Sequence, residues 1–497
     1  MALIIASVLA RSSEQVIRQA RRAAMLGADW LEMRLDVWSP QEDLAPVIDA
    51  IGLPVLVACR TPEDGGQYRG TLTARRELLT HALHAGAQGI DLEQWETWTP
   101  SAGRTGLKMR IRSFHSFTGV PKELDRIRDE LSSPGTIVKL VVTAHDLADA
   151  APIFELLRDT NQSEQPTVAF AMGRTAWPTR VLAASMGSPL VYGSIDEQEA
   201  TVPGQPSVAI LAELYRVGSL RYDTKWYGLL GNPAMHSLGP WLHNRAFRRL
   251  DIDAVYLPLE TSRPEAVISM LSGGCLAGLS VTAPHKERLL DACLHLSDEA
   301  SAVGAVNTML AVPGGGWHGY NTDVLGVRSA LESVGAIDGD GSSAVVLGAG
   351  GAARAAAYAL LQLGFEVTML ARSHGPVRVF AEQYGIHLGS LSAAVIVELQ
   401  PSVIVHATPI GSYGRDDDER VLPDFEPQPG TIVHDMVYRP VMTRLLRDAE
   451  AAGAVVVPGV EMFLRQARAQ VRIFAEQDLS EAALRGFLAG SAMATDT

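Results

Sequence analysis

Short apolar segments alternate with segments of helical pattern through about the first 200 residues, and this alternation restricts the fold more than any other feature. Helical stretches such as residues 13–25 and 73–84 separate most of the apolar segments, and a helix over 207–217 is expected to close this part of the chain. Eight strands alternating with helices predict an α/β fold, a (β/α)8 TIM barrel whose catalytic side chains lie at the carboxyl ends of the strands. An open doubly wound sheet is the alternative. The eight candidate strands are residues 3–8, 30–35, 55–58, 89–92, 108–113, 137–142, 168–171 and 190–193.

The composition describes a globular protein with more than one domain. A chain of 497 residues exceeds what one core usually serves, so we expect two or three domains. Its net charge of -14 argues against a nucleic-acid partner. Cys59, Cys275 and Cys293 show no zinc or disulfide spacing, so we expect a reducing, cytoplasmic location and no metal. The apolar residues 1–8 are too short for a membrane span and lack the basic start of a signal peptide, so we expect no membrane association.

Several of the expected strands end in ionisable side chains. Lys139 would close an apolar strand, where burial and nearby arginines lower the pKa of its amine. A neutral amine can form a Schiff base with a ketone, and His115 on a neighbouring strand suits the proton transfers that follow. Alone, such a lysine is usually a surface charge and such a histidine structural, but together they favour a catalytic site. The other ionisable residues at these strand ends are Glu32, Arg34, Arg60 and Arg180.

A second polar group stands in the other half of the chain. Lys286, Asn307 and Asp323 lie in a short window rich in amide and hydroxyl side chains. Such a set can hold a polyhydroxylated acid and move a proton on its carbonyl, because an ammonium stabilises the charge that develops on a reduced ketone oxygen. For Asn307 and Asp323, turn or cap chemistry is the alternative.

A glycine-rich loop downstream indicates a dinucleotide site. An expected strand, residues 345–347, precedes the loop, and an expected helix, residues 354–363, follows it, which is the context that a Rossmann motif requires. The next strand, residues 366–370, leads to Arg372 and not to the acidic residue that NAD favours, so we expect NADP(H). The predicted cofactor-binding residues here are Gly348, Ala349, Gly350, Gly351, Ala352, Ala353, Arg372 and Ser373.

Residues 2–217 resemble the type I 3-dehydroquinate dehydratases. The motifs that carry the resemblance are LEMRLD at 31–36, CRTPEDGG at 59–66, SFHSF at 113–117 and VKL at 138–140. The resemblance implies Lys139 as the imine-forming nucleophile, His115 as general acid and base, and Glu32 as the residue that orients His115. Asp64 and Thr201 stand where the family usually has Glu and Ser. The implied substrate-binding residues are Arg34, Arg60, Asp64, Met172, Arg180, Thr201 and Gln205.

The chain from Thr224 onward resembles the shikimate dehydrogenases. YGLLGNPAMHS at 227–237 is similar to the opening strand and carboxylate loop of that family, and HATPIG at 406–411 is similar to its nicotinamide loop. The resemblance implies Lys286 and Asp323 as the proton-transfer pair. Gly239 departs from the pattern, because the family usually has a serine there. The implied substrate-binding residues are Ser237, Gly239, Thr282, Asn307, Tyr438 and Gln466, and the implied additional cofactor residues are Thr408, Met436 and Gly459.

The two resemblances together imply a bifunctional enzyme, fused in the order found in plants, that converts 3-dehydroquinate to 3-dehydroshikimate and then to shikimate. The alternatives are a different Schiff-base lyase or a non-catalytic module in the first half, and a second half that also oxidises quinate. The expected parts are a barrel at 1–217, a linker at 218–223, a substrate-binding subdomain at 224–325, a Rossmann subdomain at 326–460 and C-terminal helices at 461–497 that pack back on the substrate-binding subdomain.

Overall fold

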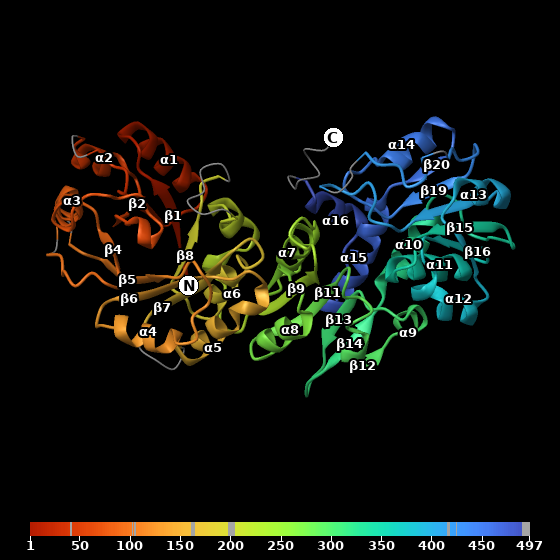
Figure 1. Cartoon of the computed structure of the whole chain (residues 1–497), viewed down its shortest axis with the longest axis horizontal. Coiled ribbons are helices and arrows are strands. Elements are labelled where there is room, and N and C mark those ends of the chain that lie inside the picture. The colour runs from red at the N-terminus through yellow and green to blue at the C-terminus, as the bar shows by residue number, and fades with distance from the viewer. Residues whose placement is uncertain are drawn as a thin grey trace. The chain divides into compact units, whose positions relative to one another are not determined.

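The protein is described by a computed structural model, which covers residues 1–39, 42–101, 103, 106–160, 165–196, 204–414, 418–423 and 425–489 (Figure 1). The chain forms two compact units. The first comprises residues 1–226 and 253–276, and the second comprises residues 227–252 and 277–497. The first unit includes residues 253–276, which lie beyond the linker expected at 218–223. The expected subdomain boundaries therefore remain a prediction. No helix of the described residues is both long enough and apolar enough to cross a membrane.

The first unit contains a nearly closed barrel of eight parallel strands in sequential order, β7-β6-β5-β4-β3-β2-β1-β8. A doubly wound sheet would reverse its strand order at a switch point, so that alternative is wrong. The apolar side chains that point inward include Ile5, Leu56, Ile111 and Val168. The strands are β1 (Leu3–Leu9), β2 (Trp30–Arg34), β3 (Val55–Ala58), β4 (Gly89–Glu93), β5 (Met109–His115), β6 (Ile137–Thr143), β7 (Thr167–Met172) and β8 (Leu190–Gly193).

Helices alternate with these strands and cover the outside of the barrel (Figure 1). The helix expected over 207–217 is shorter than expected. It is helical over residues 208–214, with π-helical geometry at Ile210–Leu214, and a separate 3-10 turn follows at Val217–Ser219, because Arg216 has a left-handed φ of 50° that interrupts the helix. The helices are α1 (Ser13–Met25), α2 (Leu44–Ala50), α3 (Leu72–Ala85), α4 (Leu124–Leu131), α5 (Ala151–Thr160) and α6 (Thr179–Ser185).

A mixed six-stranded sheet follows along the chain in the order β10-β9-β11-β13-β14-β12. Its strands are β9 (Lys225–Gly231), β10 (Ala254–Glu260), β11 (Leu276–Val281), β12 (Cys293–Leu296), β13 (Thr308–Ala311) and β14 (Trp317–Tyr320). The helices of this region are α7 (Gly239–Arg249), α8 (Pro264–Ser272), α9 (Asp298–Val303) and α10 (Thr322–Glu332).

A parallel six-stranded sheet in the order β17-β16-β15-β18-β19-β20 has the strand order of a dinucleotide-binding Rossmann domain. Its first helix begins at Gly351 and not at residue 354, because Gly350 already takes the N-cap position. The strands are β15 (Ser343–Leu347), β16 (Glu366–Ala371), β17 (His387–Ser390), β18 (Val403–His406), β19 (Ile432–Asp435) and β20 (Val455–Val457). The helices are α11 (Gly351–Gln362), α12 (Arg378–Tyr384), α13 (Ala393–Leu399) and α14 (Arg444–Ala451).

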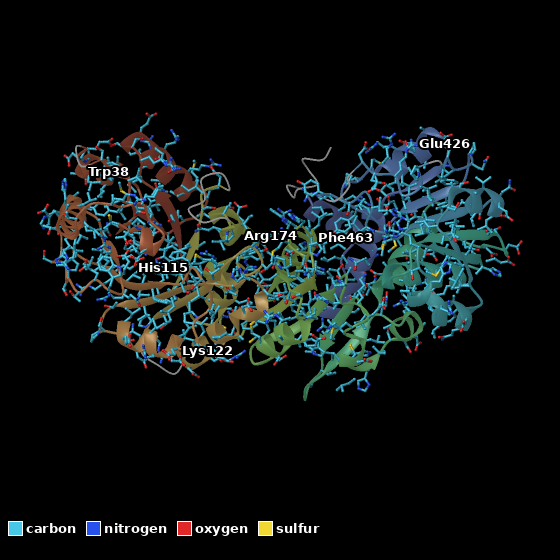
Figure 2. All side chains as sticks on the ribbon, in the orientation of Figure 1. Trp38, His115, Lys122, Arg174, Glu426 and Phe463 are labelled. Carbon is cyan, nitrogen blue, oxygen red and sulfur yellow. The ribbon has the colours of Figure 1, made fainter. Side chains whose placement is uncertain are left out.

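Two C-terminal helices, α15 (Gly459–Ala475) and α16 (Glu481–Phe487), complete the second unit. α15 packs against α10 and α7, and its residue Phe463, labelled in Figure 2, joins the apolar cluster that covers Leu242 of α7. Close packing against α10 depends on Gly326, since a Cβ at this position would lie 3.0 Å from the Cβ of Gln466. Gln466 on α15 is thereby held beside the start of α10.

Candidate active sites

Lys139 is buried inside the barrel and is surrounded by side chains from alternate strands. It is the third residue of β6, so the expectation that it closes a strand is wrong: the buried run Leu140–Val142 extends the strand beyond it. Its Nζ donates a hydrogen bond to Asp91 of β4 and lies 3.9 Å from Glu32 Oε1 of β2. The Tyr192 ring of β8 has its centroid 4.4 Å from the same nitrogen. Together these residues form one layer of the barrel interior, as expected for side chains from even-numbered strands.

Arg60 connects this layer to His115, the last residue of β5. His115 is labelled in Figure 2. One guanidinium nitrogen donates to Asp91 Oδ2 at 2.6 Å, and the other lies 3.3 Å from both Ser113 Oγ and His115 Nδ1. Because a guanidinium can only donate, His115 accepts through Nδ1. The imidazole also stacks on the ring of Phe117.

The surroundings favour the neutral forms of both Lys139 and His115. Burial lowers the pKa of the Lys139 amine, and Arg60 acts in the same direction against the opposing charge of Asp91. Burial also lowers the pKa of His115 well below its ordinary value, and both Arg60 and Lys139 add to the effect. Burial disfavours ionisation of Asp91, but the charges of Lys139 and Arg60 outweigh it and hold the pKa of this carboxyl low. The barrel therefore presents a potential amine nucleophile beside a neutral imidazole.

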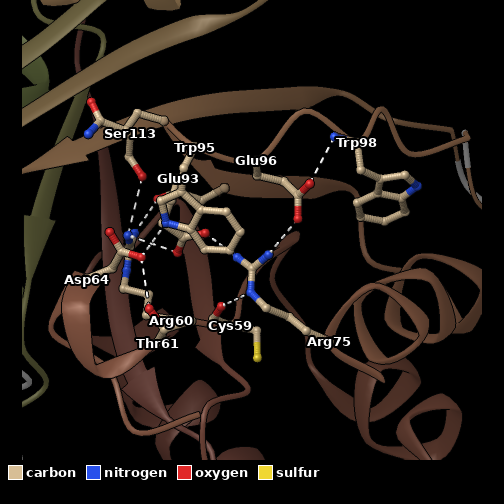
Figure 3. A network of polar contacts seen from close by, with 12 residues as sticks. Cys59, Arg60, Thr61, Asp64, Arg75, Glu93, Trp95, Glu96, Trp98 and Ser113 are labelled. Carbon is tan, nitrogen blue, oxygen red and sulfur yellow. Dashed lines mark hydrogen bonds and ion pairs between the residues drawn. The ribbon is translucent and has the colours of Figure 1, made fainter. Parts of the chain in front are cut away.

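Arg60 belongs to a buried network of ion pairs that continues through Glu93 to Arg75 and Glu96 (Figure 3). Glu93 lies between Arg60, at 3.5 Å, and Arg75, to which it is hydrogen bonded. Arg75 also contacts Glu96 at 3.0 Å and donates to the carbonyl of Cys59 at 2.6 Å. Burial raises the pKa of Glu93 to about 7, against the attraction of both arginines.

Arg180 has the features of an anion-binding residue, although it lies in α6 and not at a strand end as expected. Its guanidinium is buried over the Phe170 ring, 4.0 Å from the centroid, and donates to the Tyr192 carbonyl at 3.4 Å. Its Nε has no hydrogen-bond partner, and no acidic side chain of the described residues pairs with it. Burial without a counter-ion lowers the pKa of Arg180, so an anionic ligand would be stabilised here.

Of the other predicted substrate-binding residues of the barrel, Arg34 and Asp64 already have polar partners within the protein. Arg34 pairs with Asp36, and Asp64 accepts hydrogen bonds from Trp95 at 2.8 Å and Thr61 at 3.1 Å. Met172 ends β7, and Gln205 is buried. Thr201 lies outside the described residues.

Glu32 does not contact His115, contrary to its expected role. Its Oε2 accepts a hydrogen bond from Ser7, and its Oε1 faces Arg60 and Lys139 at 3.8 and 3.9 Å. In the structure, Arg60 holds His115 and Glu32 adds negative charge beside Lys139.

In the second unit, Lys286 donates to Asp323 Oδ2 at 2.6 Å. Lys286 follows β11 and is partly exposed, whereas Asp323 is buried in the first turn of α10. Asn321 caps that helix, and its side chain accepts from the Asp323 backbone at 3.2 Å. The pair thus combines a fixed carboxylate with a lysine whose amine can reach a ligand.

The Asn307 amide positions Asp323. Its Nδ2 donates to Asp323 Oδ1 at 2.8 Å and to Thr322 Oγ1 at 2.9 Å. Its Oδ1 accepts from the Thr322 backbone at 2.8 Å and from Thr308 Oγ1 at 2.9 Å. Gln466 Oε1 accepts from the Thr322 hydroxyl at 3.3 Å, which brings this predicted substrate residue to the same place.

Ser237 and Tyr438 lie together at the start of α7. The Ser237 hydroxyl accepts from the Gly239 backbone at 3.0 Å and is hydrogen bonded to Tyr438, whose ring stacks on Phe463. Thr282 lies beside Gly231 at the end of β9, since a Cβ on Gly231 would lie only 2.2 Å from the Thr282 methyl group.

The dinucleotide loop has the shape that a nucleotide requires. Gly348 has φ +133°, and a Cβ there would lie 2.9 Å from the Ala407 carbonyl, so a larger residue would block the loop. The space beside Gly350 is open, and the free backbone amides at the start of α11 can receive a phosphate. Gly351 lies next to Lys286, since its Cβ would be 3.6 Å from the Lys286 Cβ. The remaining residues of the loop are Ala349, Ala352 and Ala353.

The other predicted cofactor residues lie around this loop. Arg372 and Ser373 are exposed just beyond β16. The Thr408 hydroxyl is hydrogen bonded to the buried His406, which in turn contacts Asp435 Oδ1 at 2.9 Å. Met436 follows β19, and Gly459 begins α15, where a Cβ would clash with the Val437 carbonyl at 2.4 Å. These residues fit NADP(H).

Comparison with known proteins matches the two halves of the chain to two families. Residues 4–220 match the type I 3-dehydroquinase family, and residues 229–309 match the substrate-binding domain of shikimate dehydrogenase. The chloroplastic bifunctional 3-dehydroquinate dehydratase/shikimate dehydrogenase of Arabidopsis thaliana is 35% identical over 95% of this chain and 82% of its own length. This chain belongs to the bifunctional 3-dehydroquinate dehydratase/shikimate dehydrogenase family.

Further relatives match the dehydrogenase half of this bifunctional chain. The NADP+-dependent shikimate dehydrogenase of Methanothermobacter thermautotrophicus is 38% identical over 50% of this chain and 91% of its own. The crystal structure of shikimate dehydrogenase from Aquifex aeolicus is similar at 29% identity, with a TM-score of 0.49, over 53% of this chain and 97% of its own.

Membership of the bifunctional dehydratase/dehydrogenase family confirms the recognition made from the sequence motifs, the fold class and the NADP preference. The sequence analysis missed Asp91, Glu93 and Tyr192 in the dehydratase barrel. A signal was present, because two carboxylates at positions i and i+2 of an apolar strand point to the same face and are rarely buried unless paired. Tyr192 carried no such signal, since an aromatic residue in a strand usually belongs to the apolar core.

Proposed function

We propose that the barrel dehydrates 3-dehydroquinate to 3-dehydroshikimate through an imine at Lys139, and that the second unit reduces this product to shikimate with NADPH. The observation that carries the first step is the buried Lys139 beside a neutral His115. The second step rests on the Lys286–Asp323 pair next to the dinucleotide loop. The product of one reaction is the substrate of the next.

In the dehydration, the lone pair of the neutral Lys139 amine attacks the ketone carbon, and the carbonyl oxygen leaves as water to give a protonated imine. His115 then takes a proton from the adjacent carbon, and the electron pair flows toward the imine nitrogen. The hydroxyl on the next carbon leaves as water with the proton that His115 returns. Hydrolysis of the imine consumes one water and restores Lys139, so the net reaction releases one water.

Arg180 is the proposed partner of the substrate carboxylate. Its buried guanidinium offers an unused Nε–H and has no acidic partner among the described side chains, so the ligand anion supplies the missing charge. Arg60, by contrast, already has Asp91 and Glu93 as partners. Its proposed role is to hold His115 and to keep the Lys139 amine neutral.

In the reduction, NADPH supplies a hydride to the carbonyl carbon when it is bound. Lys286 donates a proton to the alkoxide oxygen that develops, and Asp323 holds the ammonium in place. Asn307 and Asn321 fix Asp323 through its side chain and its backbone. Ser237 is the proposed contact for the substrate carboxylate.

The subdomain boundaries expected from the sequence and a cytoplasmic location are further proposals. The boundary at 218–223 is supported by the division of the chain into two compact units, since the first unit runs to Trp226 before the second begins. The location is supported by three cysteines that are all free.

Incubation with 3-dehydroquinate and NADPH tests the proposed function directly. We expect shikimate to appear by mass spectrometry, with one NADPH consumed for each shikimate formed. Failure with 3-dehydroquinate but success with 3-dehydroshikimate would identify the barrel as a different lyase or a non-catalytic module. Failure with 3-dehydroshikimate would reject the reductase assignment.

Replacing Arg372 by alanine is expected to weaken NADPH binding by ~10-fold or more, the effect of losing one charge-assisted hydrogen bond to the 2′-phosphate. NADH lacks this phosphate, so its affinity should hardly change. Both affinities can be measured by fluorescence titration, with Arg249→Ala, an exposed arginine on α7, as the control. Equal losses for the two cofactors would show that Arg372 does not read the phosphate.

Gly239 supports quinate as a second substrate of the reductase. Quinate carries a C1 hydroxyl that shikimate lacks, and Gly239 contributes only a backbone amide, already bonded to Ser237. Gly239→Ser is expected to strengthen shikimate binding by on the order of 1 kcal/mol through a new hydrogen bond and to suppress quinate oxidation. Gly239→Ala fills space without adding a hydroxyl, so it should suppress quinate oxidation alone. Absence of quinate turnover in the parent enzyme would refute the proposal.

A further inference from the structure

The Tyr192 ring is a direct neighbour of the nitrogen that forms the imine. Tyr192 is the third residue of β8 and is 4% exposed. Lys139 Nζ lies over its ring, 4.4 Å from the centroid, well within the range of a cation–π contact. The contact connects β6 to β8 across the barrel interior, and the sequence resemblance assigned no role to Tyr192.

The Tyr192 hydroxyl does not explain the contact between its ring and Lys139. Its oxygen is buried and has no hydrogen-bond partner among the described residues. Burial raises the pKa of Tyr192 well above its ordinary value, and the charges of Glu32 and Asp91 act in the same direction. The phenol is therefore neutral, and its unpaired hydroxyl destabilises the fold. What Tyr192 offers Lys139 is the face of its ring.

The attraction of the ring face does not depend on whether the positive charge is carried by an ammonium or by a protonated imine. An ammonium has three N–H groups, whereas a protonated imine has one. Asp91 can accept that single N–H, but the other hydrogen-bond positions of the nitrogen are lost once it is bonded to the substrate carbon. A ring face attracts positive charge regardless of how many hydrogens the nitrogen carries. The ring can thus stabilise the imine cation as well as the ammonium.

We propose that the ring face of Tyr192 is a catalytic contact that stabilises the cationic imine on Lys139, and that the Tyr192 hydroxyl has no part in the reaction. The inference rests on the proposed dehydration through Lys139. The step it favours is the reaction of amine, ketone carbonyl and one proton to give protonated imine and water. A more stable cation raises the fraction of the enzyme present as protonated imine, the species from which the adjacent proton is removed.

The test compares Tyr192→Leu with the matched control Tyr192→Phe, which keeps the ring face. Each full-length variant is mixed with 3-dehydroquinate and treated with borohydride, and the fraction of Lys139 that gains the substrate mass is measured alongside kcat for dehydration. We expect Tyr192→Leu to lower both values by ~2- to 30-fold, the range of a cation–π contact. Tyr192→Phe should stay within about twofold of the parent, since the ring face is unchanged. Shikimate dehydrogenase activity of the same samples reports overall integrity.

A measurement without substrate separates this inference from the proposed function. The pH dependence of Lys139 acylation reports the pKa of its amine. Because the ring stabilises the cation, its loss in Tyr192→Leu should lower that pKa by about 0.4–1.5 units, and Tyr192→Phe should leave it unchanged. If the parent forms no imine, the dehydration assignment fails, while the pKa comparison still tests the contact.

Two outcomes would overturn the inference. Equal losses in Tyr192→Phe and Tyr192→Leu would assign the effect to the hydroxyl, and parent-like behaviour of both would show that the ring contributes nothing. If Tyr192→Leu does not fold, phenylalanine analogues with one to three ring fluorines at position 192 keep the shape and weaken the attraction stepwise. The trapped fraction should then fall with each fluorine, and a constant fraction would reject the contact.

Discussion

Replacing Lys139 by alanine is expected to abolish dehydration of 3-dehydroquinate, because the described residues place no other amine beside Asp91 and Glu32 to form the imine. The nearest charged groups of the barrel are Asp91, Glu32 and the guanidinium of Arg60. None of them can replace a lysine amine as the imine-forming nucleophile. Dehydration is followed by the ultraviolet absorbance of 3-dehydroshikimate, and reduction of added 3-dehydroshikimate should remain at the parental rate.

Two controls accompany Lys139→Ala. Lys122→Ala removes an exposed lysine of the same barrel and should change neither reaction. Lys139→Met keeps most of the side-chain volume, so it separates the loss of the amine from the void that alanine leaves, while both variants leave Asp91 paired with Arg60 alone among the described cations. Borohydride with 3-dehydroquinate should add the substrate mass to the parent peptide that contains Lys139. Labelling of any other lysine would contradict the assignment.

Replacing Lys286 or Asp323 by alanine is expected to suppress the reductase by ~10²-fold or more, the scale of a lost general acid. Lys286→Ala removes the proton donor, and Asp323→Ala releases the donor from its fixed position. The reaction is followed by NADPH oxidation with 3-dehydroshikimate, and dehydration in the barrel should be unaffected.

Asp323→Asn provides a matched control for the charge. It preserves the size of the side chain and a partner for the Asn307 amide, but it loses the ion pair with Lys286. We therefore expect it to reduce kcat while NADPH affinity, measured by titration, stays near that of the parent. Loss of NADPH affinity in parallel with activity would show that the pair serves the nucleotide loop and not the proton transfer.

Local patterns were sufficient to predict the architecture. Alternating apolar and helical segments predicted the barrel, and glycines between a strand and a helix predicted the Rossmann domain, because each pattern reflects which faces of its own segment are buried. The limits appeared where a single residue decides the backbone. Arg216 interrupts the expected helix over 207–217, and Gly350 as N-cap begins α11 earlier than expected.

The sequence also placed Lys139, His115, Lys286 and Asp323 among the reactive residues, since their spacing matches family motifs. It could not show which partners set their chemistry. Glu32 was expected to orient His115, yet it faces Lys139, and Arg60 holds the imidazole. Asn307 was expected to bind the substrate, and the structure adds that its amide fixes Asp323.

By itself, then, the sequence determined the fold class, the family, the order of the two enzymes and the residue types available for catalysis. Only the tertiary structure decided that Asp91 and Tyr192 contact the Lys139 nitrogen and that Arg180 is buried without an acidic partner among the described residues. The physical reason is that burial and charge act through space. A pKa depends on every group within several ångströms, and closure of the barrel brings those groups together from strands far apart in the chain.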